Sequence, residues 1–148
     1  MKKLVPSVAI AAMLAVSSLP AQAGSPWVVE NTTTKEECSA CHMAYPAGFL
    51  PERSWRAIMG NLTDHFGEDA SLGDAARTEI TNYLVALAPK ELRNVSPIAV
   101  PLRISELRWF RGEHGARRIA QARNDSRIGS ISNCAACHRG AERGNFDD

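Results

Sequence analysis

Apolar residues recur at helical spacing in two central stretches of the chain. In the first stretch the apolar positions are Leu50, Trp55, Ile58, Met59, Leu62 and Phe66. In the second stretch they are Ala76, Ile80, Tyr83, Leu84 and Leu87. Spacing of three and four residues is typical of a helix with one buried face. We therefore predict one helix that Pro51 starts and a second helix that Asp74 caps and Pro89 ends.

The other segments predict shorter or irregular elements. Residues 24–37 are polar and predict an irregular segment, which a short helical turn at the first cysteine motif would follow. Three prolines fall within residues 89–101 and indicate a connector. A third helix is expected to begin near Ser105 and to run toward His114. Because no useful length of chain alternates apolar and polar residues, we predict a mainly α protein.

The first residues carry the pattern of an export signal. Two lysines supply a positive end, an uncharged apolar run extends from Leu4 to Leu19, and Ala21-Gln22-Ala23 offers small residues for cleavage. An uncleaved membrane anchor is the alternative, but the run contains a proline, lacks a positive stop after it, and is shorter than the ~20 apolar residues that span a bilayer. We predict that residues 1–23 are a signal peptide and that the protein is periplasmic.

All four cysteines of the chain lie in two CxxCH motifs. These are Cys38-Ser39-Ala40-Cys41-His42 and Cys134-Ala135-Ala136-Cys137-His138. The spacing is the attachment signature of c-type haem, because two thiols form thioethers to the two vinyl groups of one porphyrin and the next imidazole then lies under the iron. We predict two covalently bound c-type haems, with His42 and His138 as proximal iron ligands.

Other uses of four cysteines fit the spacing less well. In an oxidising compartment they would ordinarily suggest two disulfides, with three possible pairings. A thioredoxin-like dithiol would not need the histidine in both motifs. A zinc site would be strained by a histidine directly beside a ligand cysteine.

Each iron needs a sixth ligand, and the chain after the leader offers four candidates. Met43 follows His42 directly and cannot reach the opposite face of the same haem. Met59 lies in an apolar stripe, where methionine is more often a core residue. Taken alone, His65 and His114 could each be a partly exposed polar residue. Because four histidines match two six-coordinate irons, we predict bis-histidine ligation, with His65 serving the first haem and His114 the second. Crossed assignment remains open.

The charges are divided unevenly along the chain. Residues 24–100 contain six Lys and Arg against ten Asp and Glu, whereas residues 101–148 contain nine Arg against six acids. We expect several of these arginines to pair with haem propionates, for which the guanidinium geometry is well suited. The candidates are Arg108, Arg111, Arg117 and Arg118. The alternative is a dipole that orients the protein toward a charged redox partner. The near-neutral chain gives no reason to expect nucleic-acid binding.

Four segments resemble the soluble periplasmic dihaem cytochromes c, a family often called DHC. They are CHMAYPAGFLP at 41–51, SWRAIMGNLTDHFGEDASL at 54–72, RISELRWFRGEH at 103–114 and NCAACHRGAERGNF at 133–146. The resemblance covers most of the mature chain. It implies a class I cytochrome c-like N-terminal haem domain, here residues 24–95, and a less regular C-terminal haem-binding segment, here residues 96–148. It also implies distal ligands at His65 and His114, in agreement with the count of histidines.

The resemblance further implies electron delivery to a small, high-spin, oxygen-binding monohaem cytochrome of the SHP type, with a membrane cytochrome b as the donor. We expect a monomeric electron carrier, not an enzyme, whose histidine ligands give both haems low potentials. The alternative is a haem enzyme or gas sensor in which one open haem reacts with peroxide, oxygen or nitric oxide, since His114 has glycines nearby that could let it swing away. A subunit docked permanently to a membrane complex is a third possibility.

Overall fold

Helices are the only regular elements that the described chain forms. The computed structural model describes residues 25–147, so the predicted signal peptide lies outside the described residues. Within that range there are four α-helices, short 3-10 helices between and after them, and no strand. The α-helices are α1 (Thr32–Cys38), α2 (Glu52–Met59), α3 (Asp74–Leu87) and α4 (Arg108–Asn124). The prediction of a mainly α protein is confirmed. None of the helices in the described range is long and apolar enough to cross a membrane.

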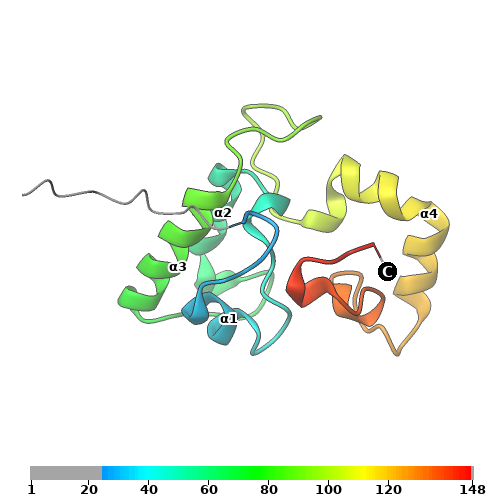
Figure 1. Ribbon diagram of the computed structural model, residues 1–148, viewed down its shortest axis with the longest axis horizontal. Coiled ribbons are helices and arrows are strands. Elements are labelled where there is room, and N and C mark those ends of the chain that lie inside the picture. The colour runs from blue at the N-terminus through cyan, green and yellow to red at the C-terminus, as the bar shows by residue number, and fades with distance from the viewer. Residues whose placement is uncertain (1–24, 148) are drawn as a thin grey trace, which may run out of the picture.

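The core lies between α2, α3 and the start of α4. Figure 1 shows α1, α2 and α3 gathered on one side of the molecule, with α4 and the C-terminal segment on the other. The buried core cluster consists of Ala47, Leu50, Trp55, Met59, Leu62, Ile80, Leu84, Leu107 and Phe110. Most of these residues come from the two predicted apolar stripes. Leu107 and Phe110 join them, so the start of α4 packs on the N-terminal half of the chain.

Helix α2 begins where the sequence predicts but ends early. Pro51 is its N-cap, and the helix stops at Gly60, although the apolar stripe continues to Phe66. The chain leaves helical geometry at Asn61 (φ −136°, ψ 48°) and turns through a short 3-10 helix, Leu62–Asp64. Leu62 still reaches the core through this turn. The prediction of one continuous helix is therefore wrong after Met59, and the break places His65 outside the helix.

Helix α3 agrees with the prediction except at its cap. Helix α1 is longer than the short helical turn that the sequence predicts. Gly73 occupies the N-cap position of α3, so Asp74 is its first helical residue and not its cap. The carboxylate of Asp74 instead accepts a 3.0 Å hydrogen bond from Arg77. Helix α1 begins within the segment expected to be irregular, because the Asn31 side chain accepts a 2.7 Å hydrogen bond from the backbone N–H of Thr34.

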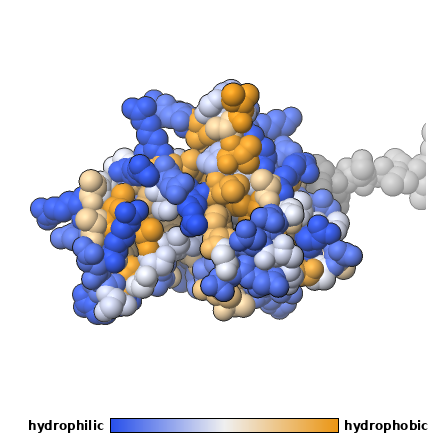
Figure 2. Space-filling model, turned by 180° about the vertical axis from the view of Figure 1, so that it is seen from behind, coloured by the Kyte–Doolittle hydropathy of each residue, from blue (hydrophilic) through white to orange (hydrophobic). Residues whose placement is uncertain are grey.

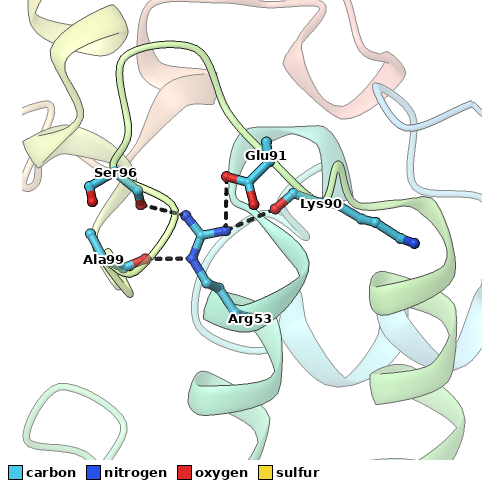
Figure 3. Close-up of polar contacts among 5 residues, drawn as sticks. All are labelled: Arg53, Lys90, Glu91, Ser96 and Ala99. Atoms are coloured by element: carbon cyan, nitrogen blue, oxygen red, sulfur yellow. Dashed lines mark hydrogen bonds and ion pairs between the residues drawn. The ribbon is translucent and has the colours of Figure 1, made fainter.

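Hydrogen bonds from Arg53 hold the proline-containing connector against α2. Its guanidinium donates hydrogen bonds to the carbonyl oxygens of Lys90 (2.8 Å), Ser96 (2.9 Å) and Ala99 (2.5 Å), as Figure 3 shows. The carboxylate of Glu91 lies 3.6 Å away. The connector follows Pro89 as predicted and is held by one side chain at several points along its length. The division of the chain into units at residues 95 and 96 stays a prediction.

Helix α4 begins and ends later than expected. A 3-10 helix occupies Ile104–Glu106, and the α-helix starts at Arg108 and continues to Asn124, well beyond His114. A kink at Gly115 (φ 64°, ψ 152°) interrupts it directly after His114. This backbone conformation is essentially restricted to glycine. The half of the helix after the kink is mostly exposed, and Ile119 within it packs against the core cluster.

Candidate haem-binding sites

The first cysteine motif lies at the end of α1. The helix ends at Cys38, and the backbone N–H of His42 donates a 3.3 Å hydrogen bond to the Cys38 carbonyl, which closes a tight turn. Cys38 is half-buried and Cys41 is exposed, and the two sulfur atoms form no disulfide. Burial, with a contribution from the charge of Glu37, raises the pKa of Cys38 to about 11.

The second motif forms a similar turn without an α-helix before it. A 3-10 helix covers Cys134–Ala136, and the N–H of His138 donates a 2.8 Å hydrogen bond to the carbonyl of Cys134. Cys134 is half-buried and Cys137 is exposed, and the two sulfur atoms form no disulfide. Burial raises the pKa of Cys134 as well.

His65 lies opposite His42. Their ring centroids are 6.1 Å apart, and the ring planes differ by 21°. His65 is held in a tight turn, in which its N–H donates a 2.7 Å hydrogen bond to the carbonyl of Glu68, while Phe66 (φ 59°) and Gly67 (φ 102°) take left-handed conformations. Burial and the neighbouring His42 lower the pKa of His65. The neutral imidazole, the form that binds metal, is therefore favoured.

His114 lies opposite His138. Their ring centroids are 5.9 Å apart, and the planes are almost perpendicular, at 89°. The His114 ring stacks on Phe110 with a centroid distance of 4.0 Å and an angle of 18°. Its Nδ1 lies 2.9 Å from the Phe110 carbonyl oxygen. The fold thus places His65 beside His42 and His114 beside His138, so each predicted distal histidine faces the proximal histidine that the sequence assigned to it.

These separations fit an iron atom between the two rings of each pair. A metal–imidazole bond is about 2 Å long and the ring centre lies roughly 1 Å beyond the nitrogen, so imidazoles on opposite sides of one metal have centroids about 6 Å apart. Among residues 25–147, no three His, Cys, Asp or Glu side chains group into a metal site. Two facing pairs of histidines suit two haems, and the described residues offer no zinc site. The assignment of individual ligands stays a prediction.

Apolar surface adjoins the first histidine pair. A cavity of about 290 Å³ is lined by Ala57, Ile58, Asn61, Asp64, His65, Phe66, Gly67 and Leu102. Figure 2 shows hydrophobic side chains gathered in a band between hydrophilic parts of the back face. Phe66 and Leu102 are among the large hydrophobic residues that the fold leaves exposed. A porphyrin is a large apolar plate, so surface of this kind suits its binding. Met59 is buried in the core cluster, as expected of a packing residue.

Tyr45 connects the two sites. Its ring stacks on His42 at 4.7 Å and 13°, and its hydroxyl donates a 2.7 Å hydrogen bond to the carbonyl of Ser132, two residues before the second motif. Burial is the main cause that raises the pKa of Tyr45 to about 12, so the hydroxyl stays a donor. No local sequence signal indicates this contact, because its partner lies 87 residues away.

Phe110 and Phe146 complete the surroundings of the second pair. Phe146 lies 5.8 Å from the His138 ring and 5.2 Å from Phe49, so it joins this site to the N-terminal half. Phe110 also packs in the core cluster. Its position one helical turn before His114 is a signal that could have shown its contact with that ring, since residues four apart on a helix are neighbours.

Comparison with known families decides the identity of the chain. The family model for dihaem cytochrome c matches residues 34–146. The chain belongs to the dihaem cytochrome c family. Its members carry two covalently bound c-type haems, and attachment at the two CxxCH motifs of this dihaem cytochrome c stays a prediction. Among curated proteins nothing matches the chain.

Solved structures of dihaem cytochromes c are similar to this one. A diheme cytochrome c from Rhodobacter sphaeroides is 51% identical, with a TM-score of 0.74 over 80% of this chain and 98% of that one. The diheme cytochrome sb-DHC from Shewanella baltica OS155 is 38% identical, with a TM-score of 0.67 over 81% of this chain and 89% of that one. The family implies an electron-transfer function.

Proposed function

We propose that this dihaem cytochrome c is a periplasmic electron carrier in which histidine ligates both faces of each iron. The observation that carries the proposal is the facing of two histidine pairs, His42 with His65 at 6.1 Å and His138 with His114 at 5.9 Å. Each haem supplies one iron that takes up and gives up a single electron. With both axial positions filled by histidine, no ligand has to enter or leave when the electron moves, and the potential is low.

The second nitrogen of two of these histidines has a backbone partner. The Nδ1 of His42 lies 2.7 Å from the carbonyl oxygen of Met43, and the Nδ1 of His114 lies 2.9 Å from that of Phe110. Such contacts fix the tautomer, so that Nε2 is the nitrogen directed at the metal, and they raise the basicity of the ligand. A more basic imidazole stabilises the ferric state more than the ferrous state. The backbone therefore contributes to a low potential.

The arrangement around His114 supports a carrier more than a gas-binding enzyme. An open second haem would require His114 to leave its place. The ring is stacked on buried Phe110 and held by the Phe110 carbonyl, and both contacts oppose that movement. The glycine kink follows His114 in α4 and does not free the turn that precedes it.

For the partners, we propose a small monohaem cytochrome as acceptor and a membrane cytochrome b as donor. The resemblance to the DHC family suggests both.

Near-infrared magnetic circular dichroism of the oxidised protein tests the ligation. Low-spin ferric haems with two histidines and those with histidine and methionine have charge-transfer bands at clearly different wavelengths. We expect only the bis-histidine band, with intensity for two haems. A histidine–methionine band would contradict the proposal and would indicate Met59 as an axial ligand.

A further inference from the structure

The two histidine pairs differ in the relative rotation of their rings. The centroid distances are nearly equal, at 6.1 Å and 5.9 Å, but the planes are 21° apart for His42 and His65 and 89° apart for His114 and His138. Near-parallel and perpendicular imidazoles act differently on the iron between them. The protein therefore builds two electronically different sites from the same ligand type.

Contacts with the rest of the chain hold these planes. His42 is stacked on Tyr45 at 13°, and its Nδ1 contacts its own neighbouring backbone at the Met43 carbonyl. His114 is stacked on Phe110 at 18° and contacts the Phe110 carbonyl through Nδ1. Phe110 is only 5% exposed and belongs to the hydrophobic core. The plane of His114 is thus fixed by a residue that cannot itself turn freely.

The ring planes decide which iron d orbitals are raised in energy. Parallel imidazoles donate into the same d orbital, raise it above its partner, and ease removal of an electron from it. Perpendicular imidazoles raise both orbitals equally, so neither is raised as far. Removal of an electron is then harder, the ferric state is less favoured, and the reduction potential is higher.

Building on the bis-histidine ligation proposed above, we propose that the second haem, between His114 and His138, has the higher reduction potential, and that Phe110 is the positioning residue that makes it so. Electrons that enter at the first haem then move toward the second. The C-terminal haem is accordingly the site from which the electron leaves.

The charge distribution also favours a higher reduction potential for the second haem than for the first. Reduction adds a negative charge to the haem, so a positive environment raises the potential and a negative one lowers it. Helix α4, which carries His114, contains five arginines, and none of them has an ion pair within residues 25–147. Residues 24–100 carry four more acidic than basic side chains. Because these charges are mostly exposed, solvent weakens their effect, and we assign the larger part to the ring planes.

A redox titration followed by electron paramagnetic resonance tests the order directly. In the oxidised holoprotein we expect two low-spin signals of equal integrated intensity. The first haem should give a rhombic signal, and the second haem a highly anisotropic signal with a large maximum g value. As the potential is lowered, the highly anisotropic signal should disappear first. Two rhombic signals, or earlier loss of the rhombic signal, would overturn the inference while leaving the ligation intact. A high-spin signal would overturn the ligation itself.

Substitution at Phe110 tests its positioning role. Phe110→Leu removes the stacked ring, so the highly anisotropic signal should lose intensity to a rhombic one and the higher midpoint potential should fall. Trp109→Leu is the matched control, because Trp109 contacts Phe110 and Phe49 but not His114, and both signals should remain. Unchanged signals and midpoints in Phe110→Leu would refute the role of Phe110. If that variant fails to bind haem, the wild-type titration still decides the order of potentials.

Discussion

His65 and His114 reach their positions by different local means. His65 lies in a turn closed by backbone hydrogen bonds with Glu68, and His114 lies on a helix one turn after Phe110. The sequence alone predicted both residues, because four histidines matched two irons. It did not predict the orientation of the rings, since this depends on the Phe110 carbonyl and on stacking that forms only after the helix has packed.

Removal of either distal histidine should open one iron. We expect His65→Ala and His114→Ala each to retain two attached haems, because the cysteines are untouched, and each to convert half of the low-spin haem to a high-spin form. Optical spectra of the oxidised and reduced proteins measure this conversion. Met59→Leu is the control, and its spectrum should equal that of the wild type, since Met59 is a buried core residue. An unchanged spectrum in both alanine variants would refute the assignment of ligands.

Among the elements, α3 could be predicted closely and α2 and α4 only in part. Apolar periodicity located α3 because its buried residues Ile80 and Leu84 and its partly buried residues Tyr83 and Leu87 recur at helical spacing. The same signal predicted too late an end for α2, because Leu62 lies in the core although it belongs to a 3-10 turn after Gly60. The second half of α4 carries few apolar residues, so no periodicity marked its extension to Asn124.

The kink in α4 gives a prediction about glycine. Gly115→Ala should lower the free energy of unfolding by about 1–3 kcal/mol, because its backbone conformation strains any other residue. Gly112→Ala is the matched control. It lies in the same helix with helical geometry and has open space around it, so alanine should stabilise by about 0.5–1 kcal/mol. Chemical denaturation followed by the Soret band measures both. Equal effects of the two substitutions would contradict a role for the kink.

At the scale of the whole molecule, aromatic contacts and one arginine join the two halves. Phe49 contacts Trp109 at 5.5 Å and Phe146 at 5.2 Å, and Gly144 approaches the backbone of Trp27 so closely that a Cβ would lie 2.5 Å from its carbonyl oxygen. These contacts link residues far apart in sequence, so no local pattern could predict them. The family resemblance supplied the general arrangement, and the structure supplies the contacts.

Arg53 should limit the backbone motion of the connector, residues 89–101. Arg53→Met removes the donors to the carbonyls of Lys90, Ser96 and Ala99, so amide hydrogen exchange across residues 90–99 should become faster. We expect a loss of about 0.5–1.5 kcal/mol in stability, the net contribution of a typical hydrogen bond, because water can reach the exposed acceptors. Arg56→Met is the control, because Arg56 lies on the same helix and bonds only to Glu52. Equal exchange in the two variants would exclude this role of Arg53.

Addition of carbon monoxide to the reduced protein tests the central claim most directly. If His42 and His65 fill both axial positions of one iron, and His138 and His114 those of the other, carbon monoxide has no free position to occupy. The Soret band of the dithionite-reduced protein should then stay unchanged on the timescale of mixing. A rapid shift with a stoichiometry of one or two carbon monoxide molecules per protein would contradict the account.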